Sequence, residues 1–162
     1  MTPAERLAEL ADGANPRLIR RMRSGFAVMH ESQFLPGYCL LLAYPLVPHL
    51  NELKGRVRSI FFDDMALLGD AVMAATDCAR VNYSIYGNLD PFLHAHVVPR
   101  YEWELDEYRT IPPLMYPAEV QSAPSSIYNH LDHCDLKDLI SQHLHDLLEH
   151  HNAHHESHHR AL

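Results

Sequence analysis

Two histidines placed two residues apart are the side chains of this sequence best arranged for joint chemistry. His94 and His96 lie in the segment Phe92–Val98, which reads FLHAHVV. Side chains alternate along a β-strand, so both imidazoles project from one face with Cα atoms about 7 Å apart. Two rings at that spacing can converge on one small group, such as a phosphate or a metal ion. On this segment alone, half of a metal site and a pair of surface histidines remain alternative interpretations.

Polar side chains come shortly before this strand. Asn88 and Asp90 lie in a loop that contains Gly87, and Asn82 lies in the preceding expected strand. These groups can line a concave pocket beside the imidazoles, of the kind that holds a nucleotide. For each position the alternative is an ordinary asparagine or aspartate at a turn or strand end.

The elements that must position these residues indicate a mixed α and β chain. Apolar residues recur at spacings of three and four from about Leu53 to Ala79, which predicts a long amphipathic helix whose apolar stripe lies on a sheet. Pro36 and Gly37 favour a turn, so the strands on either side of them form a hairpin. The four expected strands cover residues 26–29, 38–42, 81–85 and 92–98.

Further helices are expected at both ends of the chain. The segment Thr2–Glu5 carries a capping box and a proline, so it begins a helix that runs to about Ala11. An Asn-Pro pair predicts a second short helix over residues 15–23. Residues 135–149 have a helical apolar period, whereas residues 150–162 have none, and we expect these last residues to form a flexible, histidine-rich tail.

Composition limits the classes of function. A chain of 162 residues is the size of one domain, and its 47% hydrophobic content is enough for a sizeable core. Thirteen Lys and Arg against 21 Asp and Glu give a net charge of -8, so nucleic acid is not expected as a partner. Three cysteines without a CxxC pair support neither a disulfide framework nor a cysteine-based zinc site.

No membrane or export signal is recognised in the sequence. Residues 1–12 mix acidic and apolar types and lack the basic-then-apolar pattern of a signal peptide. The longest apolar stretch, Tyr38–Val47, is interrupted by Pro45 and is too short to span a bilayer. We therefore expect a cytoplasmic protein with no membrane partner.

The segments around the two histidines resemble the histidine triad (HIT) superfamily of nucleotide hydrolases and transferases. The family pattern is His-x-His-x-His-x-x, often followed by Pro-Arg, and here it reads Phe92-x-His94-x-His96-x-x-Pro99-Arg100. Three upstream segments are similar to the first core strand of the family, its PGH-LV turn and strand, and the approach to its long helix; these are 26–28, 36–42 and 48–53. The resemblance extends from about Ser24 to Tyr101, about half of the chain.

The resemblance implies a reaction in two steps at the α-phosphorus of a nucleotide derivative. His94 takes the position of the nucleophile and forms a covalent nucleotidyl-histidine, which water or another acceptor then releases. A neutral imidazole performs this attack near pH 7, and its second nitrogen bonds a backbone carbonyl in the family. His96 takes the third position, where a hydrogen bond to a phosphate oxygen or the bridging oxygen stabilises developing charge.

Phe92 departs from the pattern because it occupies the place of the first histidine. A phenyl ring neither donates a hydrogen bond nor transfers a proton, so that role is lost or has moved; the candidate replacements are His30, His49, His130 and His133. Loss of one such helper costs on the order of 10²-fold in rate. The resemblance also places His30, Asn82 and Asn88 among the residues that bind ribose or phosphates.

The resemblance further implies an α+β fold, with an antiparallel sheet covered by a long helix and a C-terminal helical extension. We expect a single HIT-like domain over residues 1–149, with its core at about 24–101, and a homodimer. The motif requires no cofactor. A divalent metal ion is the remaining candidate cofactor, bound either with the substrate or by the tail. In the tail, histidine pairs recur every four residues at 150–151, 154–155 and 158–159.

Three hypotheses for function follow. The first is a hydrolase that cleaves a nucleoside or dinucleoside polyphosphate, such as diadenosine tetraphosphate, or another nucleotide derivative through His94. The second is a nucleotide-binding protein without catalysis, suggested by Phe92. The third is a metal-binding protein, suggested by the histidine-rich tail.

Overall fold

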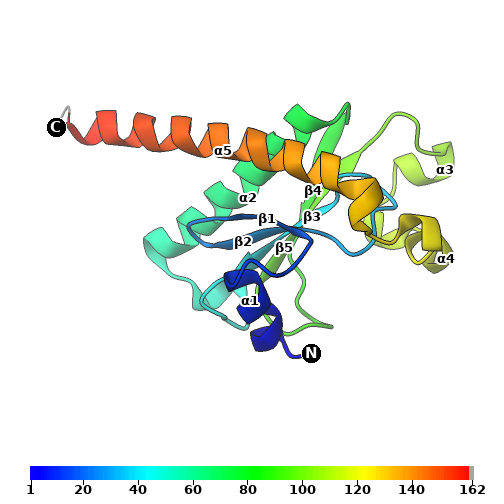
Figure 1. Ribbon diagram of the computed structural model, residues 1–162, viewed down its shortest axis with the longest axis horizontal. Coiled ribbons are helices and arrows are strands. Elements are labelled where there is room, and N and C mark those ends of the chain that lie inside the picture. Colours follow the sequence, from blue (N-terminus) through cyan, green and yellow to red (C-terminus); the bar gives the residue numbers. More distant parts are fainter. Residues whose placement is uncertain (161–162) are drawn as a thin grey trace.

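The computed structural model describes the backbone of residues 1–160 and the side chains of residues 1–154. Five antiparallel strands form one sheet in the order β1-β2-β3-β5-β4 (Figure 1). The strands are β1 (Leu18–Arg21), β2 (Gly25–Met29), β3 (Cys39–Ala43), β4 (Arg80–Ser84) and β5 (His94–Arg100). The longer helices are α1 (Pro3–Ala11), α2 (Gly55–Ala75) and α5 (His130–Arg160). The expected α+β class and antiparallel sheet are confirmed.

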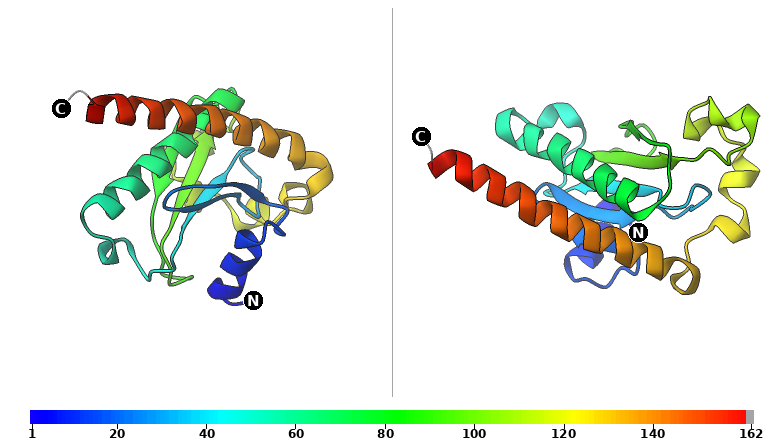
Figure 2. Two further views of the ribbon diagram at one scale, coloured as in Figure 1. Left: turned by 60° about the vertical axis from the view of Figure 1, so that its left-hand side comes forward. Right: turned by 90° about the horizontal axis from the view of Figure 1, so that it is seen from above.

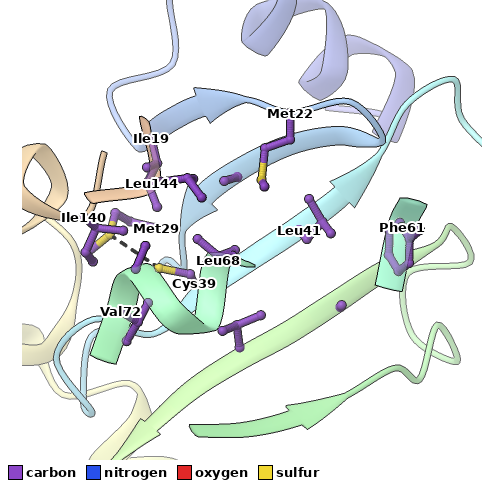
Figure 3. Packing of buried hydrophobic residues seen from close by; sticks show 14 of the residues in the cluster. Ile19, Met22, Met29, Cys39, Leu41, Phe61, Leu68, Val72, Ile140 and Leu144 are labelled. Atoms are coloured by element: carbon purple, nitrogen blue, oxygen red, sulfur yellow. Dashed lines mark hydrogen bonds between the residues drawn. The ribbon is translucent and has the colours of Figure 1, made fainter. Parts of the chain in front are cut away.

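The helices α2 and α5 cover one face of the sheet, and α1 lies on the other (Figure 2). The main core forms between the sheet and the two covering helices, where Leu68 of α2, Ile140 of α5 and Leu41 of β3 are fully buried (Figure 3). The second face carries α1 at one end and is otherwise open enough to hold two cavities. This division leaves one face of the sheet available for a site.

The predicted hairpin is present, and it sets the register of the whole sheet. β2 pairs with β3 so that Phe26 lies opposite Leu42, and β3 pairs with β5 so that Leu42 lies opposite His94. The strand expected at 92–98 begins at His94 and extends to Arg100, because the backbone N–H of Leu93 bonds the carbonyl of Val47 outside the ladder. The other three expected strands are found within one residue of their predicted limits.

The prediction of a helix over residues 15–23 is wrong, because Leu18–Arg21 forms the edge strand β1. It pairs with β2 through a tight turn in which the N–H of Met22 donates to the carbonyl of Gly25. Pairing with β2 and burial of Ile19 in the core outweigh the local Asn-Pro start signal, as tertiary contacts commonly do. A side chain on Gly25 would meet the Leu42 carbonyl oxygen at 1.8 Å, so this close approach of β2 to β3 requires glycine.

The C-terminal helix is longer than predicted at both ends. It begins at His130, where the side chain of Asn129 accepts a hydrogen bond from the N–H of Asp132 at 2.9 Å and so caps the helix. It continues to Arg160 through the segment expected to lack regular structure, and no glycine or proline occurs between these ends to stop it. The flexibility of residues 150–162 and the domain limit at 149 stay predictions.

Residues 102–126 contain short helical turns, although the prolines of 111–113 and 117–126 favour extended, irregular chain. These are α3 (Asp106–Arg109), α4 (Ala118–Gln121) and two turns of 3₁₀ helix at Pro113–Met115 and Pro124–Ser126; another 3₁₀ turn, Leu50–Glu52, precedes α2. In the described part of the chain, no helix combines the length and the apolar character needed to cross a membrane.

Asp64 of α2 connects this helix to the turn between β1 and β2. Its side chain is fully buried, and it accepts hydrogen bonds from the N–H and hydroxyl of Ser24 at 2.8 and 2.7 Å. Arg23 completes the contact at 3.2 Å. Burying a carboxylate costs free energy unless it is hydrogen-bonded or paired with a cation, as Asp64 is by Ser24 and Arg23. These contacts help to hold α2 against the sheet.

We expect Asp64→Ala to lower the free energy of unfolding by about 3 kcal/mol, because it leaves the Ser24 donors and Arg23 without their acceptor. Urea denaturation of the purified protein measures the change. Asp70→Ala, an exposed position on the same helix, is the matched control and should leave stability nearly unchanged. Equal effects of the two substitutions would contradict this role of Asp64.

Candidate functional site

The two histidines lie on the open face of β5, as their spacing predicts. Leu93, Ala95 and Val97, which alternate with them, are buried in the core on the side of α2. The imidazole centroids of His94 and His96 are 5.1 Å apart. The strand therefore holds both rings side by side on a backbone fixed from behind by the core.

His94 is oriented by a hydrogen bond to its own strand. Its Nδ1 lies 2.8 Å from the carbonyl oxygen of Phe92. A carbonyl only accepts, so Nδ1 carries the proton, and the lone pair of the neutral ring is on Nε2. The side chain is 9% exposed and lines a cavity, which gives an unprotonated nitrogen access to a ligand.

His96 is held by a tyrosine. The hydroxyl oxygen of Tyr38 lies 2.5 Å from Nδ1 of His96. Burial, followed by the nearby His94 and His30, lowers the pKa of His96 to about 4, so the ring is neutral at pH 7. Burial also raises the pKa of Tyr38, and this neutral phenol can donate to Nδ1. That arrangement leaves the proton of His96 on Nε2, where it can serve as a hydrogen-bond donor.

Tyr38 is a site residue that the sequence argument did not identify. It follows Pro36-Gly37 at the position where the family pattern PGH has its histidine. That difference from the pattern was a usable signal, because a polar aromatic side chain at the start of a strand beside β5 reaches the same face. Its ring also stacks on His30, with centroids 3.9 Å apart and planes 6° apart.

His30 belongs to the same cluster. Its ring centroid lies 6.2 Å from that of His96, and its Nδ1 lies 3.0 Å from the backbone nitrogen and 3.1 Å from the carbonyl oxygen of Ser32. Burial lowers the pKa of His30, so this ring is also predominantly neutral at pH 7. With the proton on Nδ1, this nitrogen donates to the Ser32 carbonyl and Nε2 accepts from a ligand; with the proton on Nε2, that nitrogen donates to a ligand.

Phe92 is part of an apolar cluster. It is 3% exposed and packs with Leu7 and Leu10 of α1 and with side chains of β2 and β3. Its ring centroid is 4.8 Å from that of His94. The position of the first triad histidine thus anchors α1 to the open face and provides an apolar wall beside His94.

The other candidate replacements for that histidine do not line the cavities beside His94. His49 lies 3.7 Å from Glu52, and Nδ1 of His133 contacts the backbone of Asn129 while its ring stacks on Tyr128. His130 is exposed at the first turn of α5. Among the candidates, His30 shares a cavity with His94, whereas His49 borders a separate cavity of about 220 Å³ together with Phe92.

Two cavities lie on the open face and meet at His96. The first has a volume of about 890 Å³ and is bordered by α1, the loop that contains Asn88, His30 and both strand histidines. The second, of about 840 Å³, lies over β4 and residues 109–114. Three residues, Tyr86, His96 and Leu114, border both cavities. Each volume is in the range of small-molecule sites.

The expected substrate-binding residues divide between these cavities. His30 and Asn88 border the first cavity with His94, as do Arg6 and Arg17. Asn82 borders the second, where its side-chain oxygen accepts a hydrogen bond from Arg100 at 2.8 Å. Its amide N–H₂ group keeps its capacity to donate. Ser84, directly opposite His96 in the ladder, lines the same cavity and was not predicted.

A metal centre formed by protein side chains is not evident in the described residues. No group of three or more His, Cys, Asp and Glu residues is placed to hold an ion among the side chains of residues 1–154. In α5, the rings of His150 and His154 stack at 6.5 Å, and His151 lies 4.0 Å from Asp63 of α2. The side chains of His155, His158 and His159, which belong to the proposed tail site, lie outside the described residues.

Comparison with known proteins relates the chain to histidine triad structures by fold. No protein-family model matches the sequence, and no curated protein matches it. A histidine triad protein of Sinorhizobium meliloti 1021 superposes with a TM-score of 0.66 and 16% identity, over 78% of this chain and 87% of that one. A hypothetical histidine triad nucleotide-binding protein of Sulfolobus tokodaii superposes with a TM-score of 0.65 and 12% identity, over 87% of this chain and 91% of that one. A zinc-bound histidine triad family protein of Mycobacterium smegmatis superposes with a TM-score of 0.58 and 16% identity, over 90% of this chain and 95% of that one.

The lowered pKa of His96 predicts a pH dependence of stability. Its pKa is 6.5 in a free side chain and about 4 in the fold, so the unfolded chain binds the proton more tightly. The contribution of neutral His96 to the free energy of unfolding is therefore complete above pH 6.5 and is lost as the pH falls from 6.5 to 4. We expect a loss of about 2 kcal/mol, allowing for partial exposure.

The measurement is urea denaturation at several pH values with His96→Gln as the reference, since glutamine does not titrate. The wild type should lose stability more steeply than this variant between pH 6.5 and 4. Parallel curves would show that His96 binds protons equally in both states, contrary to this prediction.

Proposed function

We propose that this protein cleaves nucleotide derivatives at the α-phosphorus through a covalent intermediate on His94. The observation that carries this proposal is the 2.8 Å contact between Nδ1 of His94 and the Phe92 carbonyl. In the neutral ring this contact places the proton on Nδ1 and the lone pair on Nε2, and the ring borders a cavity of nucleotide size. A nucleophilic imidazole requires both conditions, a free lone pair and room for the reacting phosphorus.

In the first step, the lone pair of His94 Nε2 attacks the α-phosphorus. A bond forms between Nε2 and phosphorus, and the bond from phosphorus to the leaving group breaks, with its electron pair departing on the leaving group. In the second step, water attacks the same phosphorus, the bond to Nε2 breaks, and the water loses one proton to solvent. His94 returns to its neutral form with its proton on Nδ1.

His96 is placed to stabilise charge during both steps. Its ring is beside that of His94 at the junction of the two cavities, and its Nε2–H is available because Tyr38 occupies Nδ1. A fixed donor directed at an oxygen that gains charge lowers the barrier without a change of protonation. We assign His96 this role toward the bridging or non-bridging oxygen.

The first cavity is the proposed site of the nucleotidyl group. Arg6 and Arg17 supply positive charge on its border, and His30 and Asn88 supply hydrogen-bonding groups. These side chains suit phosphate oxygens and ribose hydroxyls. The naming of the Sulfolobus tokodaii relative as nucleotide-binding supports this assignment. Nucleoside and dinucleoside polyphosphates, including diadenosine tetraphosphate, are the proposed substrates, and a homodimer in the cytoplasm is the proposed form.

A divalent metal is proposed only as a companion of the substrate phosphates. The zinc-bound relative shows that a protein of this fold has been seen with a metal. In the described residues, the first cavity is lined by imidazoles, guanidiniums and the Asn88 amide, and also by the carboxylates of Glu31 and Asp90. The proposed steps require only the imidazoles, the guanidiniums and the amide.

Binding without catalysis is the second candidate function, and Phe92 is the observation that favours it. Its burial with Leu7 and Leu10 shows that the first triad position has a structural task in this chain. Loss of the first histidine of the pattern lowers the reaction rate on the order of 10²-fold, whereas loss of His94 removes the nucleophile itself. Direct assay separates the two functions.

Substitution of His94 by alanine is predicted to abolish turnover of diadenosine tetraphosphate, since no other group replaces the nucleophile. Rapid quenching without acid, followed by mass spectrometry of the intact wild-type protein, should reveal a nucleotidyl adduct on His94. His49→Ala, at an exposed histidine away from both cavities, is the control and should retain activity.

Two results would contradict catalysis in different ways. A wild type that AMP stabilises against heat, but that turns over no nucleotide derivative, would support the binding function. A wild type that neither binds nor cleaves nucleotides would exclude both.

Replacement of Tyr38 by phenylalanine tests the orientation of His96. The phenyl ring keeps the stack on His30 but removes the hydroxyl at Nδ1. We expect kcat to fall about 10-fold with little change in KM, because the lost interaction acts mainly in the transition state. Tyr44→Phe, at an exposed position directly after β3, is the matched control. Equal kinetics of the two variants would show that the Tyr38 hydroxyl does not position His96.

A further inference from the structure

The second cavity begins where the proposed nucleotidyl site ends. Its floor is the open face of β4 and β5, with Ser84, Asn82 and His96. One wall is residues 109–114, which begin at the last residue of α3 and belong to the segment with no counterpart in the sequence resemblance. Arg109 of α3 and Gln121 of α4 border this cavity, whereas Arg6 of α1 borders the first; α3 and α4 lie to the right of the sheet in Figure 1 and α1 lies below it. His96 borders both.

The charged side chains that line this cavity are three arginines, two of which are paired with carboxylates outside the lining. Its lining includes Arg80, Arg100 and Arg109 and no aspartate or glutamate. Arg100 is engaged by Glu104 and by the carbonyls of Tyr108 and Ile111. Arg109 pairs with Asp106 at the exposed rim. Arg80 is exposed and forms no ion pair with any described residue, which leaves its guanidinium available to an anion.

Flat and apolar side chains line the cavity near His96. The exposed ring of Tyr86 lies with its centroid 6.0 Å from that of His96, and Phe34 and Leu114 border the same space. Aromatic side chains are favourable surfaces for a planar ring. The cavity thus combines a cation with a stacking surface, of which Tyr86 and Leu114 also border the nucleotidyl site.

We infer that the second cavity binds the leaving group and selects one that is anionic and carries a planar ring, as a nucleoside phosphate does. This inference rests on the proposed function, because it concerns the other half of the same substrate. The bond that breaks lies beside His96, the phosphate chain continues toward Arg80, and the ring lies among Tyr86, Phe34 and Leu114.

The chemistry of departure supports an anionic leaving group. A phosphate leaves with its electron pair and needs no proton, since its second pKa is about 6. An amine must receive a proton from a general acid as it departs. Phe92 cannot supply one, and the lowered pKa of His96 keeps that ring predominantly neutral at pH 7. The groups around the reacting centre therefore favour phosphate over amine leaving groups.

The test compares two substrates with the same adenylate half. Diadenosine tetraphosphate loses a nucleoside polyphosphate, and adenosine 5′-phosphoramidate loses ammonia. We expect Arg80→Gln to lower kcat/KM for diadenosine tetraphosphate about 10-fold, a modest loss because Arg80 is exposed, and to change kcat/KM for the phosphoramidate less than about two-fold. Arg56→Gln, an exposed position on α2, is the control and should affect neither substrate.

A second measurement on the wild type does not depend on any substitution. Added salt should lower kcat/KM for diadenosine tetraphosphate more than for the phosphoramidate, because exposed charges are screened. The inference is overturned if Arg80→Gln affects both substrates equally or if the wild type prefers the phosphoramidate; in both cases the proposed function stands. If the wild type forms no adduct with either substrate, the proposed function fails and this inference fails with it.

Discussion

The hydrogen bond between Nδ1 of His94 and the carbonyl of Phe92 is the contact on which the proposed chemistry depends. It fixes the tautomer, the ring orientation and the position of the Nε2 lone pair together. The bond holds because both ends are anchored: Phe92 is packed against α1, and Ala95, next to His94, is fully buried in the core. A site residue on a rigid strand, backed by a packed layer, keeps its geometry without help from a ligand.

The network around His96 shows how this chain differs from the triad pattern. The pattern places a histidine at position 92 and another after Pro36-Gly37, whereas this chain has Phe92 and Tyr38. The tyrosine hydroxyl bonds His96 directly, and its ring carries the stacked His30. A phenol that stays protonated carries no charge at neutral pH, whereas a second histidine at this position could take up a proton there. The site therefore relies on orientation of neutral groups.

Much of this arrangement could be predicted from the sequence, and the exceptions have physical causes. Period-two alternation placed His94 and His96 on one face, and the apolar period identified α2, because both signals are local. The edge strand β1 was missed since pairing with β2 overrode a local helix signal. The pairing of Tyr38 with His96 joins residues 58 positions apart, and the split of His30 and Asn82 between two cavities depends on residues 102–126, whose sequence has no regular period. Long-range contacts of this kind leave little trace in one sequence.

A crystal structure with a non-hydrolysable nucleotide, such as the α,β-methylene analogue of ADP, tests the central claim most directly. The account predicts that the α-phosphorus lies about 3–3.5 Å from Nε2 of His94, in line for attack, with the Nδ1 bond to the Phe92 carbonyl kept. A nucleotide bound with its α-phosphorus away from His94, or a ring turned so that Nε2 faces the Phe92 carbonyl, would contradict it.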